Sequence, residues 1–226
     1  MLGCFFTIRT NFVTMIFRLT KQLIFPNPEL AEPDGLLAVE GDLSTERLLL
    51  AYQSGIFPWY SDDTPILWYS PHERFVLFPA ELNISSSMRR VLNSGRFRVT
   101  FDTCFAGVIE ACSVVERKDQ DGTWITSDMK AAYIKLHEEG PAHSVEVWQD
   151  DDLVGGMYGV VVGSVFCGES MFSKVSNASK TALISLIKTG KYKLLDCQVH
   201  TDHLESMGAR MISRKEYMAM LADSGV

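Results

Sequence analysis

The segment 166–203, FCGESMFSKVSNASKTALISLIKTGKYKLLDCQVHTDH, constrains the fold of this chain more than any other part of it. It places a Gly-Glu-Ser turn, a helix and an Asp-x-Gln strand in one short unit. Because side chains on a strand alternate between its two faces, Asp196 and Gln198 are expected on one face and their apolar neighbours on the other. The pattern indicates a polar functional face or, equally well, the solvated face of an edge strand.

Length and composition predict a globular protein with one sizeable core, or a small domain followed by a medium one. The chain has 226 residues, of which 46% are hydrophobic and 22% charged, and it shows no low-complexity run or internal repeat. The formal net charge of -7 argues against indiscriminate coating of nucleic acid. A local basic cluster is compatible with a phosphate-binding surface or with a merely solvated face; it comprises Arg89, Arg90, Arg96 and Arg98.

The cysteines and histidines predict no disulfide framework and no metal or other cofactor. Five cysteines, without a CxxC pair, lie mostly in apolar runs, which is typical of reduced core residues in a cytosolic protein. His200 and His203 flank Asp202, but an HxxH pair without a third ligand at a recognisable spacing is weak support for a metal site.

The first 24 residues are expected to form an extension ahead of the folded domain. Arg9 and Arg18 interrupt its apolar stretch well short of the ~20 residues that a membrane span requires, so no membrane association is expected. The extension is interpreted as a loose arm, or as sequence ahead of a translation start at Met15.

The remainder predicts an α+β fold with a central sheet and helices on its faces. Ser44 is a candidate helix N-cap and Gly55 a stop, and the proline- and aromatic-rich connector after it suggests a domain boundary near 69–72. In the helix expected over TSDMKAAYIKLHEEG, the spacing of the apolar residues places Tyr133 on the buried stripe. Further helices are expected over FAGVIEACSVV and NASKTALISLIKTG, and an exposed loop over 116–122. Strands are expected over FVLFP, RFRVTF and LLDCQV. The segment HSVEVWQDDDLVGGMYGVVVGSVFCGES is expected to form two or three antiparallel strands that turn at 150–152.

Three side chains in loops or turns are ambiguous between packing and binding. Trp59 follows Pro58 in the connector and Trp124 follows a Gly-Thr pair, so these rings are either core anchors or the walls of a cleft. Glu169 in the predicted turn is either a helix cap or a holder of a ligand's ammonium group. No GxSxG elbow and no P-loop is present, which argues against a serine hydrolase and a P-loop nucleotidase.

Eight ordered blocks, running from residue 25 to near the end of the chain, resemble the leucyl/phenylalanyl-tRNA-protein transferases of bacteria. The blocks are FPNPELAEPDGLLAVEGDLSTERLLLAYQSGIFPWY, ILWYSP, GTWIT, HSVEVW, LVGGMYGV, FCGESMFS, NASKTAL and LLDCQV. The resemblance implies a small N-terminal domain over 25–70 and, over 71–226, an acetyltransferase-like (GNAT) domain with a mostly antiparallel sheet. It also implies the transfer of leucine, phenylalanine or, less well, methionine from aminoacyl-tRNA to the N-terminal Arg or Lys of acceptor proteins, which marks them for N-end rule degradation in the cytoplasm; a monomer is expected.

The resemblance also assigns site residues. Asp196 and Gln198 match the family's catalytic pair, in which the aspartate helps to activate the attacking amine through the glutamine. Tyr52, Trp59, Trp124 and Tyr133 match positions around the 3'-terminal adenosine and aminoacyl group, and Phe166, Gly168, Glu169 and Leu195 match the aminoacyl pocket.

Two positions depart from the family pattern. Thr201 stands where an asparagine is common, which affects one polar contact near the adenosine. Leu186 stands at a pocket-floor position where relatives can carry phenylalanine, so we expect a wider pocket that handles phenylalanine at least as well as leucine.

Elementary chemistry is compatible with these assignments. An α-amine has an unperturbed pKa of roughly 8, so little base strength is needed, whereas holding amine and ester together is worth ~7 to 11 kcal/mol. Bases at a single-stranded RNA end stack on aromatic rings for ~1 to 3 kcal/mol each. Two other functions fit the sequence less well: an acyl-CoA-dependent N-acetyltransferase, for which a pyrophosphate-binding turn is missing, and a non-enzymatic RNA-binding module.

Overall fold

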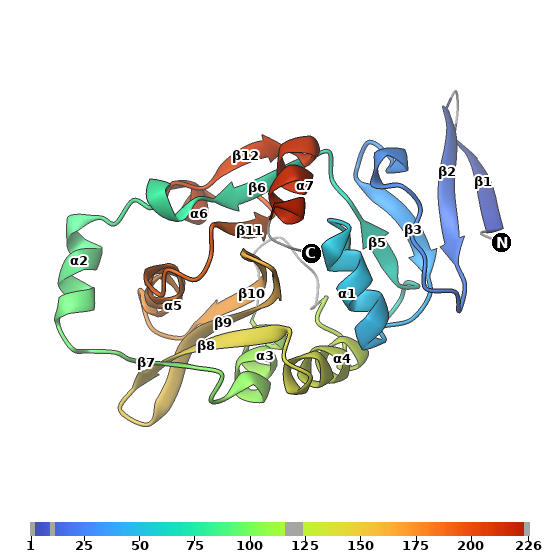
Figure 1. Ribbon diagram of the computed structural model, residues 1–226. Coiled ribbons are helices and arrows are strands. Elements are labelled where there is room, and N and C mark those ends of the chain that lie inside the picture. The colour runs from blue at the N-terminus through green and yellow to red at the C-terminus, as the bar shows by residue number, and fades with distance from the viewer. Residues whose placement is uncertain (1–2, 10–11, 116–123, 224–226) are drawn as a thin grey trace.

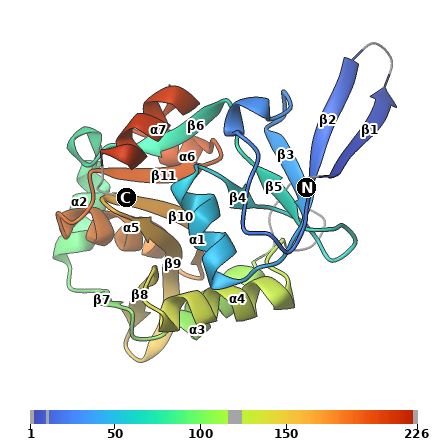
Figure 2. The same ribbon diagram turned by 45° about the vertical axis from the view of Figure 1, so that its right-hand side comes forward.

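The computed structural model describes residues 3–9, 12–115 and 124–223, and it contains two β-sheets (Figure 1). The predicted loop at 116–122 lies outside the described residues. The smaller sheet is built from the N-terminal part of the chain and the larger one from the rest. Their relative orientation, with helix α1 between them, is clearest in Figure 2.

The smaller sheet has five strands in the order β1-β2-β3-β5-β4. Strand β2 pairs in parallel with β3, with Phe17 opposite Ala38, and Phe17 and Leu19 are buried. Residues 12–19 were expected in a loose arm and instead form an inner strand, on which Phe17 and Leu19 cover the core. The strands are β1 (Gly3–Arg9), β2 (Phe12–Leu19), β3 (Leu36–Glu40), β4 (Phe57–Pro58) and β5 (Leu67–Tyr69).

The larger sheet has seven strands in the order β12-β6-β11-β10-β9-β8-β7. Its pairings are antiparallel except that between β10 and β11, which confirms the expected mostly antiparallel sheet flanked by helices. The strands are β6 (Glu73–Leu77), β7 (Arg98–Phe101), β8 (Ala142–Gln149), β9 (Asp152–Val162), β10 (Val165–Ser173), β11 (Leu194–Gln198) and β12 (Arg210–Ser213).

Helices cover both faces of the larger sheet. The helix predicted around Tyr133 is present, with Met129, Tyr133 and Leu136 buried, and Ser44 is the N-cap of the helix that ends before Gly55. The α-helices are α1 (Thr45–Gln53), α2 (Ser86–Asn93), α3 (Phe105–Ser113), α4 (Ser127–Glu138), α5 (Ala178–Lys188), α6 (Asp202–Glu205) and α7 (Arg214–Ala222), and two short 3-10 helices span Pro28–Leu30 and Pro79–Glu81. Among the helices described, none combines the length and the apolar character that crossing a membrane requires.

Two apolar cores lie on opposite faces of the larger sheet. Helix α5 covers one core, which contains Met157 and Phe166. The other core lies under α3 and α4 and continues without a break into the smaller sheet, where Leu37 and Trp68 are fully buried. This core is continuous across both predicted domain boundaries, at 24/25 and at 70/71, because residues on each side of them pack in it together.

Candidate functional site

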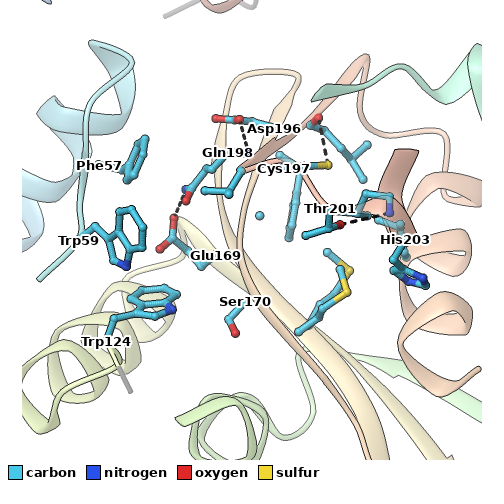
Figure 3. A pocket seen from close by; sticks show the side chains of 18 of the residues that line it. Phe57, Trp59, Trp124, Glu169, Ser170, Asp196, Cys197, Gln198, Thr201 and His203 are labelled. Carbon is cyan, nitrogen blue, oxygen red and sulfur yellow. Dashed lines mark hydrogen bonds between the residues drawn. The ribbon is translucent and has the colours of Figure 1, made fainter. Parts of the chain in front are cut away.

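A cavity of about 380 Å³ opens where the parallel strands β10 and β11 diverge (Figure 3). The two strands pair only as far as Cys167 opposite Asp196. Just beyond this point each strand carries an irregularity against its other neighbour: β10 between Gly168 and Ser170, and β11 between Asp196 and Gln198. A bulge bends and re-aims its strand, so these two irregularities direct side chains into the gap.

The bulges change two expectations about local structure. Glu169 was expected in a turn ahead of a helix, yet it is the extra residue of the β10 bulge, in the middle of a strand. The strict alternation expected for LLDCQV also fails, because Gln198 adopts a left-handed φ of 59° at the second bulge. As a result Cys197 lines the cavity together with Asp196 and Gln198.

The structure brings most of the predicted site residues to this cavity. Those that line it are Trp59, Trp124, Phe166, Gly168, Glu169, Leu195, Asp196, Gln198 and Thr201. Several further lining residues, chiefly apolar ones, were not predicted from the sequence: Phe57, Pro58, Met157, Met171, Leu183 and Leu204. Leu183 was within reach of sequence reasoning, because it lies on the same helix as Leu186 and one turn from it.

Three predicted residues do not line the cavity. Leu186 belongs to the core under α5 and does not line the cavity, so the expectation of a wider pocket that handles phenylalanine at least as well as leucine stays a prediction. Tyr52 and Tyr133 are 2% and 0% exposed and lie behind Glu169, from helices α1 and α4. Their hydroxyl groups are hydrogen-bonded to each other, and that of Tyr133 donates to Glu169 Oε2 at 3.2 Å.

A second set of hydrogen bonds fixes the two residues of the Asp-x-Gln strand. Arg74, on β6, donates from Nε and Nη2 to the carboxylate of Asp196. Asp196 Oδ1 also accepts from the backbone N of Gln198 at 3.0 Å, and Gln198 Nε2 donates to Glu169 Oε1 at 2.7 Å. One chain of contacts therefore runs from Arg74 through Asp196 and Gln198 to Glu169, and Figure 3 shows its last two links.

The two buried carboxylates differ electrostatically because, within the part of the chain that the structure describes, Asp196 is paired with a cation and Glu169 is not. Burial raises the pKa of Glu169 to about 7, against hydrogen bonds from Tyr52, Gln198 and Tyr133 that lower it. Burial, followed by the charge of Glu169, also raises the pKa of Tyr52 and of Tyr133, so both hydroxyls remain donors. Glu169 is thus the carboxyl group in this cavity that changes charge near neutral pH.

The structure also places the cysteines and the two histidines that were considered as a nucleophile and as a metal pair. Burial raises the pKa of the Cys167 and Cys197 thiols, which agrees with the absence of a nucleophile motif around them. The histidines weighed as a metal pair separate: His203 lines the cavity, whereas His200 lies in an exposed group with Asp202 and Glu205.

Aromatic rings form one wall of the cavity, opposite Thr201 and His203 (Figure 3). Trp59 is 38% exposed and contacts Tyr69 edge-on at a ring distance of 5.9 Å. Trp124, just before α4, lies beside Trp59. Partly exposed rings at a cavity mouth suit a flat ligand.

Room for the Phe166 ring in the floor comes from Gly159 on the adjacent strand β9. A Cβ added at Gly159 would lie 2.3 Å from the carbonyl oxygen of Cys167 and 2.6 Å from the Phe166 ring. The contact is too short for any real side chain, so glycine at 159 permits the ring's position.

Comparison with known proteins identifies relatives over nearly the whole chain. Residues 76–222 match the family model described as leucyl/phenylalanyl-tRNA protein transferase, and residues 41–72 match the model of its N-terminal domain. A leucyl/phenylalanyl-tRNA--protein transferase of Syntrophobacter fumaroxidans is 58% identical over 212 residues, covering 92% of this chain and 91% of the relative. Another, of Flavobacterium psychrophilum, is 57% identical over 206 residues, covering 90% and 98%.

The fold is also found in the crystal structure of FemX. The two structures superpose with a TM-score of 0.52 at 10% sequence identity, over 94% of this chain and 86% of FemX. At this identity the similarity concerns the architecture alone.

The shifted pKa of Glu169 predicts a pH-dependent stability. Its ordinary value is 4.5 and its value in the folded protein about 7, so the folded state binds the proton more tightly and the free energy of unfolding falls as pH rises between these values. Relative to Glu169→Gln, the wild type should lose up to roughly 3 kcal/mol across this window. Urea denaturation of both proteins at pH 5, 6, 7 and 8 measures the difference.

The control for this prediction is Glu81→Gln, whose exposed carboxyl has its pKa lowered by Arg210 and so titrates below the window. Parallel stability curves for the wild type and Glu169→Gln would contradict the assignment of a buried, titrating Glu169.

Proposed function

Because this chain belongs to the leucyl/phenylalanyl-tRNA protein transferase family, we propose that it transfers leucine or phenylalanine from aminoacyl-tRNA to a protein acceptor, forming a peptide bond. The observation that carries the proposal is the cavity between β10 and β11, which combines an apolar floor with a hydrogen-bonded carboxylate and amide at one end. Such a site suits an amino acid with an apolar side chain and polar main-chain groups.

The floor binds the side chain of the donor amino acid. Phe166, Leu195 and Leu183 form it with Met157 and Met171, and the flexible thioethers adapt to side chains of different shape. Leucine, phenylalanine and methionine share an unbranched Cβ, and rejection of valine or isoleucine has to come from steric clash, because an apolar pocket gains only about 1 to 3 kcal/mol per methylene.

Glu169 receives the amino group of the donor. Its carboxylate is held by the Tyr133 hydroxyl on one oxygen and by Gln198 on the other, and it lies at the end of the apolar floor. An ionised Glu169 attracts an ammonium group, so Tyr52 and Tyr133 contribute by supporting Glu169 rather than by touching the ligand.

Asp196 and Gln198 form the catalytic pair. In the reaction the acceptor's α-amino nitrogen attacks the ester carbonyl carbon, the C–N bond forms, the bond from carbon to the ribose oxygen breaks, and one proton passes from nitrogen to that oxygen. Gln198 donates its amide NH to Glu169 and presents its amide oxygen to the acceptor amine, and Asp196 acts through Gln198, because it holds the backbone of that residue. The principal contribution is the orientation of amine and ester.

The aromatic wall and its opposite rim bind the end of the tRNA. Trp59 and Trp124 offer faces on which the terminal adenine stacks, and Thr201 lies across the cavity from them. Exposed arginines on α2 and in the segment between α2 and the start of β7 are suited to bind the phosphate backbone of the tRNA. They are Arg89, Arg90, Arg96 and Arg98.

The acceptors are proteins with an N-terminal Arg or Lys, which the added residue marks for N-end rule degradation, and methionine is a poorer donor. We place this reaction in the cytoplasm and assign it to a monomer that requires no cofactor.

The proposed activity is tested by incubating the protein with labelled Phe-tRNA and a peptide beginning with Arg. Label should pass to the peptide, and ribonuclease treatment of the Phe-tRNA beforehand should abolish transfer. The same peptide with an acetylated N-terminus is the matched control, since its α-nitrogen cannot attack. Absence of label in the free peptide, or thermal stabilisation of the protein by acetyl-CoA in place of transfer, would count against the proposal.

Trp59→Ala should weaken the use of aminoacyl-tRNA far more than it weakens folding. Loss of one stacked base at ~1 to 3 kcal/mol corresponds to about a 5- to 150-fold rise in KM for Phe-tRNA. Because the ring is partly exposed, the free energy of unfolding should fall by less than about 1 kcal/mol.

Trp68→Ala is the matched control, because Trp68 is fully buried between the sheets and should cost about 3 to 5 kcal/mol of stability. Steady-state kinetics and urea denaturation of both variants separate the two roles. An equal loss of stability in the Trp59 and Trp68 variants would show that Trp59 serves as a core residue and not as a stacking surface.

A further inference from the structure

Arg74 lies at the start of the hydrogen-bond chain that ends in the cavity, and it does not itself line the cavity. Its side chain is 2% exposed, and that of its partner Asp196 is not exposed at all. The guanidinium group stacks over Phe57 at 4.9 Å and over Tyr217 at 4.4 Å, and its Nη1 donates to the carbonyl oxygen of Gly55 at 2.9 Å. Every side of this cation is therefore in contact with a specific group.

These contacts join three parts of the site. Arg74 belongs to β6 and Asp196 to β11, whereas Gly55 begins the segment that carries Phe57 and Trp59 into the aromatic wall. The segment has further anchors, because the carbonyl oxygen of Gly55 also accepts from Ser70 Oγ and β4 pairs with β5. Loss of the guanidinium would therefore release chiefly the carboxylate of Asp196.

The conformation of Gln198 depends on the same carboxylate. A left-handed backbone is uncommon for a residue with a side chain, so it requires compensating contacts. At Gln198 the backbone N donates to Asp196 Oδ1, one of the two oxygens that face Arg74. An Asp196 freed from Arg74 would be a buried carboxylate without a cation, which is costly, and the acceptor for the Gln198 backbone would lose the contacts that fix its position.

We propose that Arg74 is a positioning residue of the transfer reaction, which acts through Asp196 to hold Gln198 in its reactive orientation. The inference rests on the proposed function. Arg74 touches none of the reacting atoms; it holds the Asp196 carboxylate in place, and Asp196 in turn fixes the bulge from which Gln198 reaches Glu169.

Arg214 supplies a matched control for a purely structural role. It is likewise a buried arginine, 4% exposed, and it likewise joins the C-terminal part of the chain to the N-terminal segment, by donating to the carbonyl oxygen of Ser70 and to Glu29. Its contacts do not include Asp196 among the described residues. Arg214→Met should therefore lower the melting temperature and leave the transfer step close to the wild-type rate.

The experiment measures single-turnover transfer from labelled Phe-tRNA to a peptide beginning with Arg, together with Phe-tRNA binding and melting temperature. Arg74→Met should slow transfer by about 100-fold, the effect expected when a reacting group is misplaced by about 1 Å, with little change in Phe-tRNA affinity. Arg74→Lys, which keeps the charge but not the two-pronged contact, should recover part of the rate.

The variant Asp196→Asn and its combination with Arg74→Met decide whether Arg74 acts through Asp196. If it does, the double variant is no slower than the slower single variant, and it melts higher than Arg74→Met because no unpaired buried carboxylate remains. If the losses multiply, if Arg74→Met transfers at the wild-type rate, or if Arg214→Met is equally slow, the inference is wrong.

The controls keep the result interpretable. Should Arg74→Met not fold, the transfer rates of Arg74→Lys and of the double variant test the role of Arg74 instead. Failure of the wild type to transfer label would overturn the proposed function, whereas an active wild type with an equally active Arg74→Met would overturn only the role of Arg74.

Discussion

Two carboxylates buried beside one cavity are the constraint around which the site is built. A buried charge is costly unless it is paired and hydrogen-bonded, so Asp196 and Glu169 each require partners from several elements. Asp196 obtains a cation from β6, whereas Glu169 obtains neutral donors from α4 and β11. The contrast gives the cavity one carboxylate paired with an arginine and one whose pKa burial raises to about 7.

The paired strands explain how these groups meet. Parallel β10 and β11 hold together only to Cys167 and Asp196, and each then bends at an irregularity. Bulges commonly occur beside active sites, because an extra residue redirects a side chain without breaking the sheet. Here the extra residue of one bulge is Glu169 and that of the other is Cys197, followed directly by Gln198, and all three side chains line the cavity.

The sequence predicted the regular parts of the molecule well, because amphipathic spacing and turn residues carry that information locally. The buried stripe of α4, the cap at Ser44 and the sheet with flanking helices are examples. Its failures share a cause. The bulge at Glu169, the burial of Tyr52 behind it and the pairing of Asp196 with Arg74 all depend on contacts between residues 81 or more positions apart or on register shifts, which no local pattern records. Even the family resemblance, which named nine of the nineteen lining residues, contained no sign of Arg74.

Gly159 has a consequence for comparing members of such a family. It does not line the cavity, yet its missing side chain leaves room for the Phe166 ring. A catalogue of lining residues alone would give identical pockets to two proteins that differ at this one strand position, although a methyl group there would meet both the Cys167 backbone and the aromatic floor. The shape of the cavity therefore depends partly on β9, the strand next to β10. A comparison of donor preference between relatives should include the residues that pack behind the cavity lining.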